Sequence, residues 1–562
     1  MFFNSIKNTA ILLVIKLKMF RVISTLVCWF VGTCVIGNAY VLPQNEAEHR
    51  MHPSFNFKAK HIFKRAMPML NFGAAQPEEE LADYWNGLAQ DILEQQLESK
   101  TKLNTNMAQN VIMFLGDGMS IPTLAAGRVY MGGEEKQFNF EKFPYTGLSK
   151  TYCANTQVAD SACTATAYLG GVKANYATIG VTAAIELNDC LAQNNSVHHV
   201  SSIAEWAQRH GMATGLITTT TVTHASPAGI YAHAANRNWE NDVEVLQDNG
   251  DLDICPDIAT QLIKGAVGQK LNIIMGGGRG HFLPVWQKDI EGKSGKRLDG
   301  INLVEQWKQQ HGANAHYVQT KEELLKLPQN TERVLGLFAD YHMPYHMDAE
   351  AKNLPTLSEM VAAALDILKR QSQGRGFFLF VEGGRIDHAH HETQAMKALD
   401  ETVEFDKAIQ LAQQRTSEQN TLTVVTSDHS HTMSLAGYSS RKNDILSISN
   451  GQMATDNLPY ATLSYANGPG YNNNLLKSDL TSRTNLQLVN MKDKNYKFPA
   501  TAPLESETHG GDDVAVFARG PFAHLFTGVY EQNFIPHAMA YASCLGSKKT
   551  ACSEGLHREQ RF

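Results

Sequence analysis

Phe377-Phe378-Leu379-Phe380-Val381-Glu382-Gly383-Gly384 is an unbroken apolar run that ends in an acid and two glycines. Comparable runs recur along the chain, with helical patterns between most of them, at residues 111–115, 214–218, 271–275, 334–338, 422–426 and 514–518. Unbroken apolarity, as opposed to alternation, is typical of strands that are covered on both faces. The pattern predicts an α/β fold with one large domain, whose mostly parallel central sheet is flanked by helices.

Acidic residues and histidines closely follow three of these runs. Asp117 follows the earliest run in the chain, Glu382 and Asp387 follow the run quoted above, and Asp428 and His429 follow the next one. In open α/β sheets, ligands bind outside the carboxyl ends of the strands. We therefore expect these side chains to gather at one edge of the sheet.

Several of these residues have the spacing and chemistry of metal ligands. Asp387 and His391 are four residues apart, so on a helix they share a face and can bind one ion. Asp428 and His429 supply a second carboxylate and imidazole, and His509 precedes the last apolar run. A single histidine is more often structural than a ligand, but so many acids and imidazoles at strand ends argue against coincidence. Ligands of this mixed type favour zinc.

A set of oxygen ligands accompanies the histidines. Asp117, Glu382 and a hydroxyl such as that of Ser226 form an all-oxygen group, which suits magnesium. The sequence thus predicts several divalent cations around one site.

A candidate nucleophile lies in Asp160-Ser161-Ala162-Cys163-Thr164-Ala165-Thr166-Ala167. This stretch places a serine at the N-terminus of a closely packed helix, where unpaired N–H groups and the helix dipole favour an anion. An Asp N-cap on an ordinary Ala/Thr helix is the alternative. A metal ion beside Ser161 would lower the pKa of its hydroxyl, and a second ion would generate hydroxide and stabilise the leaving oxygen. Arg237 could bind phosphoryl oxygens with two N–H groups, unless it forms a surface ion pair.

Length and charge limit the possible functions. The chain has 562 residues, 43% of them hydrophobic, which is enough to bury a large core. The net charge is -7 and no long basic run compensates it, so we expect no nucleic acid as a partner.

The first residues have the pattern of a targeting segment. In residues 1–39, basic side chains precede the apolar run 22–36, which ends in small residues near Ala39. This pattern predicts a cleaved secretory signal. An uncleaved anchor is the alternative, although the run is shorter than the roughly 20 apolar residues of a spanning helix. The sequon at Asn194 predicts glycosylation in the secretory pathway.

The remaining chain divides by composition. Residues 40–77 are irregular and basic, and residues 78–103 have the spacing of an amphipathic helix. The α/β pattern occupies residues 104–552, interrupted at about 437–503 by a Gly-, Asn- and Tyr-rich stretch that predicts an insertion over the site. Residues 553–562 form a polar tail.

Six of the eight cysteines lie beyond the targeting segment, where an oxidising compartment favours pairing. Cys544 and Cys552 are close enough in sequence to close a loop near the C-terminus, and Cys190 with Cys255 could close a longer loop. The cysteines at 153 and 163 are left over and receive no role.

Six motifs closely resemble those of the animal alkaline phosphatases, and the resemblance runs in order from about residue 78 to residue 552. They are Phe114-Leu115-Gly116-Asp117-Gly118-Met119, the stretch from Asp160 to Ala167, His224-Ala225-Ser226-Pro227-Ala228-Gly229, Val381-Glu382-Gly383-Gly384-Arg385-Ile386-Asp387-His388, Thr426-Ser427-Asp428-His429-Ser430-His431 and Glu507-Thr508-His509-Gly510-Gly511. The resemblance implies hydrolysis of phosphate monoesters at alkaline pH, by a two-zinc mechanism through a phosphoserine. A related phosphodiesterase on the same metal platform, or an inactive binding homologue, are the alternatives.

The resemblance also implies a role for each candidate residue. Ser161 is the nucleophile and Arg237 the phosphate ligand. The implied ligands are Asp387, His391 and His509 for one zinc ion, Asp117, Asp428 and His429 for the other, and Asp117, Ser226 and Glu382 for magnesium. Three further histidines, His224, His388 and His431, are expected beside these ligands.

The resemblance implies a homodimer, in which the helix within residues 78–103 reaches the partner and Tyr438 of the insertion lies near the neighbouring active site. The pairs Cys190 with Cys255 and Cys544 with Cys552 match disulfides of the family.

The chain also departs from the vertebrate pattern. The vertebrate calcium site uses a Glu directly after a Leu-Phe pair and an Asp further on, whereas here Ala339-Asp340 follows that pair and Leu354 stands at the later position, so calcium is not expected. Cys163 stands where the vertebrate enzymes have Gly. The polar tail lacks the hydrophobic signal for a lipid anchor, so we expect an extracellular or cell-surface protein whose mode of membrane attachment, if any, is undecided.

Overall fold

The computed structural model describes Tyr84, Gln90, Asp91 and residues 103–349, 352–476, 479–546 and 550–552. All of these belong to one unit, Asn71–Phe562. The expected signal at 1–39, the segment at 40–77 and the tail at 553–562 lie outside the described residues. Within residues 78–103 the structure describes Tyr84, Gln90 and Asp91, which are helical, and Leu103. Among the described helices, none has the length and apolarity to cross a membrane.

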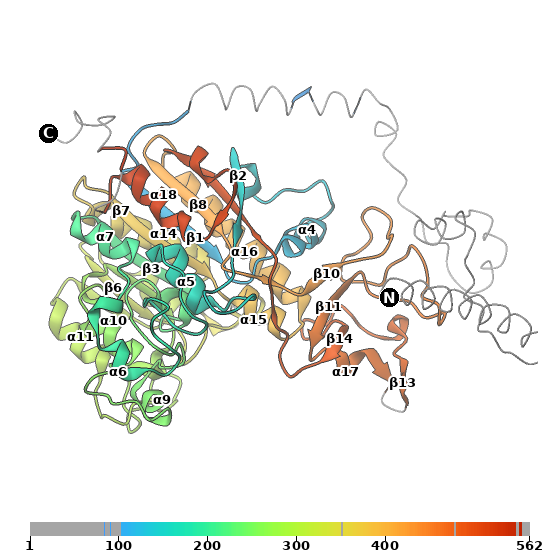
Figure 1. Ribbon diagram of the computed structural model, residues 1–562, viewed down its shortest axis with the longest axis horizontal. Coiled ribbons are helices and arrows are strands. Elements are labelled where there is room, and N and C mark those ends of the chain that lie inside the picture. Colours follow the sequence, from blue (N-terminus) through green and yellow to red (C-terminus); the bar gives the residue numbers. More distant parts are fainter. Residues whose placement is uncertain are drawn as a thin grey trace, which may run out of the picture. The chain divides into compact units, whose positions relative to one another are not determined.

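A ten-stranded sheet forms the core, in the order β17-β2-β16-β8-β1-β7-β3-β4-β6-β5 (Figure 1). Its strands are β1 (Asn110–Gly116), β2 (Tyr145–Lys150), β3 (Ala213–Thr221), β4 (Ile273–Gly277), β5 (Ala315–Val318), β6 (Arg333–Leu337), β7 (Phe377–Gly383), β8 (Thr421–Thr426), β16 (Val514–Arg519) and β17 (Gly528–Glu531). Every neighbouring pair from β8 to β5 is parallel, whereas β16 runs antiparallel to β8 and to β2. The predicted α/β fold with a mostly parallel sheet is confirmed.

All seven apolar runs form strands of this sheet, and β2, β5 and β17 were not predicted. The unpredicted strands are short and only partly buried, and they lie at or next to the edges of the sheet. Their sequences therefore lack the apolar signal that marks the central strands.

Helices cover both faces of the sheet (Figure 1). They are α4 (Ile121–Tyr130), α5 (Ser161–Gly170), α6 (Cys190–Gln193), α7 (Ile203–Arg209), α8 (Ala225–Ala228), α9 (Asp242–Gln247), α10 (Ile258–Lys264), α11 (Leu303–His311), α12 (Lys321–Leu325), α13 (His346–Ala349), α14 (Leu357–Gln371), α15 (Arg385–His391), α16 (Ala395–Arg415) and α18 (Phe534–Ser543). On β1, Val111, Met113 and Leu115 pack into one hydrophobic core with α5, while Ile112 and Phe114 pack into a second core with α14 and α16. This double coverage explains why the run is apolar at every position.

A smaller sheet lies beside the main one, within residues 433–503. It consists of β10 (Met433–Leu435), β11 (Leu463–Gly468) and β14 (Ala500–Pro503), and α17 (Tyr471–Asn474), β12 (Leu475–Leu476) and β13 (Asp479–Arg483) are nearby. Figure 1 shows this part in orange, next to α4 and α15. Its own hydrophobic core is completed by residues of α4 and α16, which fixes it to the main domain.

The strand register aligns the acids at the edge of the sheet. Leu115 on β1 is paired with Glu382 on β7 and with Thr426 on β8. Asp117 and Asp428 follow two residues after these positions in their own chain segments. Adjacent parallel strands that end at one level bring three carboxylates together, as expected for this class of sheet.

Two glycines lie just before β7, and only one of them is packed against the segment that leads into β1. Gly376 and Gly374 both have positive φ, of 85° and 83°, but a Cβ on Gly376 would lie 1.7 Å from the Gln109 carbonyl oxygen, whereas a Cβ on Gly374 has open space. Gly374→Ala should cost roughly 1 kcal/mol from backbone strain alone. Gly376→Ala should cost about 3 kcal/mol more, because the start of β7 must move away from β1. Chemical denaturation of both variants measures the difference, and equal losses would contradict this packing.

Candidate active site

Ser161 lies at the first position of α5, with its side chain pointing to the carboxyl edge of the sheet. It is 1% exposed. Asp160 caps the helix, because its carboxylate accepts hydrogen bonds from the backbone N–H groups of Ala162 and Cys163. Ser161 Oγ is 3.1 Å from His429 Nε2. The predicted serine at a helix N-terminus is therefore in contact with one of the predicted metal ligands.

Asp387, His391 and His509 bring their ligand atoms to one point. Asp387 and His391 are both on α15, and His391 Nε2 is 3.3 Å from Asp387 Oδ2. His509 Nε2, from β15 (His509–Gly510), is 3.3 Å from Asp387 Oδ1 and 3.1 Å from His391 Nε2. Three donors at these separations are suited to hold one tetrahedral cation with an open position.

Backbone carbonyls orient the two histidines. His391 Nδ1 donates to the Glu507 carbonyl oxygen at 2.5 Å, and His509 Nδ1 donates to the Ala159 carbonyl oxygen at 2.7 Å, with the tautomers assigned from these partners. The proton on Nδ1 leaves Nε2 with its lone pair directed to the shared point. Hydrogen bonds of this kind fix metal-binding imidazoles in many proteins.

A second group consists of Asp117, Asp428 and His429. His429 Nε2 is 3.1 Å from Asp428 Oδ2 and 3.6 Å from Asp117 Oδ1, and all three residues are completely buried. The remaining Asp428 oxygen, Oδ1, accepts from the backbone N–H of Gly118 at 3.0 Å. That bond fixes the carboxylate with Oδ2 facing Asp117 and His429.

A third group shares Asp117 with the second. The ligand atoms of Asp117, His224 and Glu382 lie within 4.8 Å of one another. Glu382 Oε2 accepts from Thr218 Oγ1, and from Thr220 Oγ1 at 3.2 Å. Ser226, which is on α8 two residues after His224, is completely buried. Asp117 and Glu382 of the expected oxygen-rich site are thus close together, and Ser226 is on the short helix that His224 precedes.

Several oxygen atoms of these groups are buried without a hydrogen bond to any residue that the structure describes. They are both carboxylate oxygens of Asp117, Asp428 Oδ2, Glu382 Oε1 and Ser226 Oγ. Burying polar atoms without partners is costly, and for charged groups the cost is larger. The oxygen atoms therefore fit divalent cations, which would satisfy all of them.

Electrostatics lead to the same conclusion. Burial raises the pKa of Asp117 well above its ordinary value, and the neighbouring carboxylates of Asp428 and Asp387 raise it further. Burial likewise raises the pKa of Glu382, to about 7. Burial lowers the pKa of His429 well below its ordinary value. An array of acids that resist ionisation beside neutral imidazoles is the arrangement that bound cations stabilise.

Arg237 extends the site beyond the candidate metal ligands. Its Nη1 donates to Asp160 Oδ2 at 2.9 Å, and its Nη2 donates to His224 Nε2 at 3.1 Å. The guanidinium is thereby held beside Ser161 through the residue that caps α5. Its side chain is 20% exposed and bound to a buried carboxylate, so the alternative of a surface ion pair does not apply. His388 lies next to His224, with 5.4 Å between the ring centroids.

His431 joins the first metal group to Glu507, whose role we had not predicted. His431 donates from Nε2 to Asp387 Oδ1 at 2.6 Å and from Nδ1 to Glu507 Oε2 at 2.5 Å. Burial would lower the pKa of His431, but the carboxylates of Glu507 and Asp387 outweigh it and raise this pKa to about 10. Glu507 is the first residue of the motif that contains His509, and that position was the sequence signal for it.

The structure contains both expected disulfides, Cys190–Cys255 and Cys544–Cys552. It also pairs the two leftover cysteines, Cys153 with Cys163, which the sequence left without a role. Asn194 is exposed at the end of α6, and its glycosylation stays a prediction.

Two cavities adjoin these elements, and one of them reaches the metal ligands. A cavity of about 810 Å³ is lined by His391 and His388 together with Arg385, Tyr341 and Asp340. It provides open space beside His391, one of the candidate ligands.

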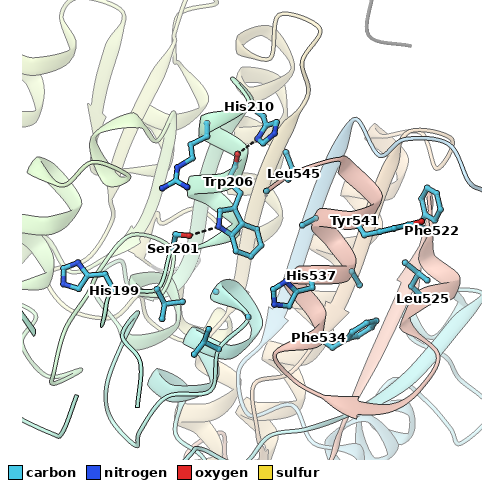
Figure 2. Close-up of a pocket in the computed structure, with 18 of the residues that line it drawn as sticks. His199, Ser201, Trp206, His210, Phe522, Leu525, Phe534, His537, Tyr541 and Leu545 are labelled. Carbon is cyan, nitrogen blue, oxygen red and sulfur yellow. Dashed lines mark hydrogen bonds between the residues drawn. The ribbon is translucent and has the colours of Figure 1, made fainter. Parts of the chain in front are cut away.

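A larger cavity, of about 1240 Å³, lies at the opposite end of α5 from Ser161 and includes Gly170 and Gly171 in its lining. In Figure 2, Trp206 from α7 faces α18, which carries His537 and Tyr541. None of the predicted ligands lines this cavity, so it is separate from the active site.

Comparison with known proteins identifies relatives of this chain. The family model for alkaline phosphatase matches residues 108–545. A membrane-bound alkaline phosphatase of Bombyx mori is 47% identical over 488 residues, which cover 84% of this chain and 87% of that protein. The tissue-nonspecific alkaline phosphatase of Homo sapiens is 45% identical over 484 residues, covering 84% of this chain and 90% of that protein.

Solved bacterial structures share the fold. The alkaline phosphatase of Thermus thermophilus superposes with a TM-score of 0.56 at 22% identity, over 81% of this chain and 97% of its own. That of the Antarctic bacterium TAB5 gives 0.53 at 24% identity, over 79% of this chain and all of its own. A variant of the TAB5 enzyme was solved with magnesium bound in its M3 site.

Removing divalent cations should make stability depend on pH. In the metal-free protein the pKa of Glu382 is about 7, above its unfolded value of 4.5, so the folded state holds a proton that the unfolded state loses. Glu382 must then contribute a fall in stability of about 2 kcal/mol as the pH rises from 5.5 to 8, whereas buried histidines such as His429 contribute in the opposite direction. The contribution of Glu382 is therefore measured as the difference in pH dependence between the chelator-treated wild type and Glu382→Gln, by chemical denaturation at both pH values. Equal pH dependence of the two proteins would contradict the assignment.

Glu507 should affect metal affinity although it is not a predicted ligand. Glu507→Gln removes the charge that holds His431 against Asp387, and we expect the affinity of the first group for Zn²⁺ to fall about 10- to 100-fold. Competition with a chromophoric chelator measures the affinity. The control is Glu505→Gln, an exposed acid two residues earlier, which should leave it unchanged. Equal affinities for the two variants would show that Glu507 does not position the ligands.

Proposed function

This chain belongs to the alkaline phosphatase family and is a phosphoric monoester hydrolase, and on that premise we propose that it acts through a covalent phosphoserine at Ser161. We further propose two zinc ions and one magnesium ion as its cofactors. The observation that carries the proposal is that Ser161 Oγ lies 3.1 Å from His429 and beside an arginine that is held by the neighbouring Asp160. Nucleophile, cation ligands and anion donor therefore converge on one point.

The proposed cations are assigned by ligand type. Zinc ions fit the carboxylate and imidazole groups Asp387/His391/His509 and Asp117/Asp428/His429, and magnesium fits Asp117, Ser226 and Glu382. When bound, these ions supply Lewis acidity, which favours the ionised serine and stabilises charge on the phosphoryl and leaving oxygens. We propose no calcium ion, because the position after Phe338 is Ala339, which offers no carboxylate.

The protein's own residues bind and orient the phosphate monoester. Arg237 can donate to two phosphoryl oxygens, and its bond to Asp160 keeps the guanidinium in place before the substrate arrives. The hydroxyl oxygen of Ser161 then attacks phosphorus, the phosphorus–oxygen bond to the alcohol breaks, and the alcohol leaves. Water hydrolyses the phosphoserine in the second step, which restores Ser161 and releases inorganic phosphate.

The rest of the substrate extends into solvent or into the adjoining cavity. That cavity includes the metal ligand His391 in its lining and also carries groups of both charges, such as Arg385 and Asp340. Such a lining selects no single class of alcohol, which supports broad specificity for phosphate monoesters. The related diesterase activity is not favoured, because Arg237 is positioned to bind the second negative charge of a monoester.

We also propose where the protein acts and how its chain is organised. Three disulfides support the secretory pathway and an extracellular or cell-surface location, after removal of the signal in residues 1–39. The catalytic domain is residues 104–552, with the insertion at about 437–503. A homodimer, joined in part by the helix in residues 78–103, is supported by the family resemblance, and Tyr438 is exposed on the insertion.

Ser161→Ala should abolish turnover, because it removes the hydroxyl that contacts His429 Nε2. We expect kcat for a simple aryl phosphate to fall by at least about 10⁴-fold, and no phosphate to remain on the protein after acid quenching. Rapid mixing with ³²P-labelled substrate measures both. Zinc and magnesium contents of the variant should match the wild type, which excludes misfolding as the cause. Near-normal turnover in a folded, metal-loaded variant would rule out the covalent route.

A further inference from the structure

The disulfide Cys153–Cys163 closes a loop that ends in the first turn of the nucleophile's helix. The two cysteines are ten residues apart, each is 2% exposed, and Cys163 is the second residue after Ser161. Resting on the proposed function, we propose that this disulfide is a positioning element of the active site: it fixes residues 159–161 so that nucleophile, phosphate-binding arginine and one zinc ligand keep their relative places.

Three consecutive residues of the closed loop contact three different parts of the catalytic machinery. The carbonyl oxygen of Ala159 accepts from His509 Nδ1 at 2.7 Å. The carboxylate of Asp160 accepts from Arg237 Nη1 at 2.9 Å. Ser161 follows directly and supplies the attacking oxygen. A displacement of this tripeptide would therefore disturb metal binding, phosphate binding and nucleophilic attack together.

The disulfide is in contact with the middle residue of that tripeptide. The sulfur of Cys163 lies 3.4 Å from the Asp160 carbonyl oxygen, and the sulfur of Cys153 lies 3.9 Å from Asp160 Oδ1. That same oxygen accepts from the Cys163 backbone N–H at 3.4 Å and from the Ala177 N–H at 2.9 Å. The bridge thus encloses the carboxylate that caps α5 and holds Arg237.

Both ends of the bridge are fixed to buried structure. Cys153 and Cys163 pack with Ala159 and Ala174 in a small hydrophobic cluster, and Ala154 N–H donates to the Ala174 carbonyl oxygen at 2.9 Å. Cys163 is held by the completely buried helix α5. The loop between them has few ways to move while the bond is intact.

The length of the loop that the disulfide closes distinguishes a positioning role from general stabilisation of the fold. The entropic gain from a disulfide grows with the length of the loop that it closes. Cys190–Cys255 spans 65 residues, whereas Cys153–Cys163 spans ten. The shorter bridge should contribute less through the unfolded chain, so a local geometric function is the better reason for its place beside Ser161.

The kinetic test compares two double variants. Cys153→Ala/Cys163→Ala should fold and should lower kcat/KM for an aryl phosphate on the order of tenfold, because small displacements of reacting groups are costly. It should also raise the inhibition constant of inorganic phosphate and the dissociation constant for zinc several-fold, as Arg237 and His509 lose their fixed partners. Cys190→Ala/Cys255→Ala should lower the melting temperature but leave all three constants unchanged well below that temperature. If the first variant also lost only thermal stability, the disulfide would be structural and the proposal wrong.

A second test uses the wild-type protein and does not depend on folding of a variant. A dithiol reductant gives two electrons to the disulfide, which yields the thiols of Cys153 and Cys163 and the oxidised reductant. If the loop is coupled to the site, inorganic phosphate must shift the equilibrium of this reduction toward the disulfide, since coupling between binding equilibria is reciprocal. Alkylation and peptide mass spectrometry after equilibration in a dithiol redox buffer should show a several-fold smaller ratio of reduced to oxidised Cys153–Cys163 at saturating phosphate and no comparable change at Cys190–Cys255. Equal effects on both bridges, or none, would overturn the proposal.

These outcomes are distinguishable from failure of the proposed function. Wild-type turnover and phosphoserine formation test the phosphatase mechanism, and they are measured without altering any cysteine. An active wild-type enzyme whose double variant keeps wild-type kinetic constants would refute the positioning role alone.

Discussion

The burial of three carboxylates side by side is the constraint on which the site depends. Asp117, Glu382 and Asp428 are completely inaccessible to solvent, and oxygen atoms of all three lack hydrogen bonds among the described residues. The negative charges of neighbouring buried carboxylates repel each other strongly, because little water screens them. Cations are the groups that can offset this repulsion without taking up the space of a side chain. Metal binding is therefore part of what makes the folded arrangement tolerable, as well as the source of its chemistry.

The sheet produces this crowding by its strand order. β7 and β8 lie on either side of β1 in the sheet. In the sequence, however, more than half of the described residues separate β1 from β7. Because these strands are parallel and in register, their acids meet at one level. Imidazoles from α15 and β15 meet Asp387, and Ser161 at the N-terminus of α5 contacts His429. Helices on both faces keep the strands buried up to the positions where the acids begin.

The central strands and the convergence of the candidate metal ligands could be predicted because their signals are local. Phe377–Gly383 is apolar at every position before its acid, and Asp387 and His391 show helical spacing within one turn. The edge strands β5 and β17 could not be predicted, because half-buried strands lack the unbroken apolar run that marks the central ones. Contacts between residues that are far apart in the chain also could not be predicted. Nothing within the sequence around Asp160 indicates that its carboxylate holds Arg237, which is 77 residues away.

The pairing of Cys153 with Cys163 shows a different limit. Six cysteines allow fifteen pairings, and spacing alone favoured the two that the resemblance also supported. The third pair then followed by elimination only if all six were paired, which the sequence did not establish. Their ten-residue separation is bridged because the intervening loop turns back at the N-terminus of α5, where Asp160 must face both the helix and Arg237. The same turn that places Ser161 beside His429 thus brings the two sulfurs together, so the position of Ser161 and the formation of the disulfide share one cause.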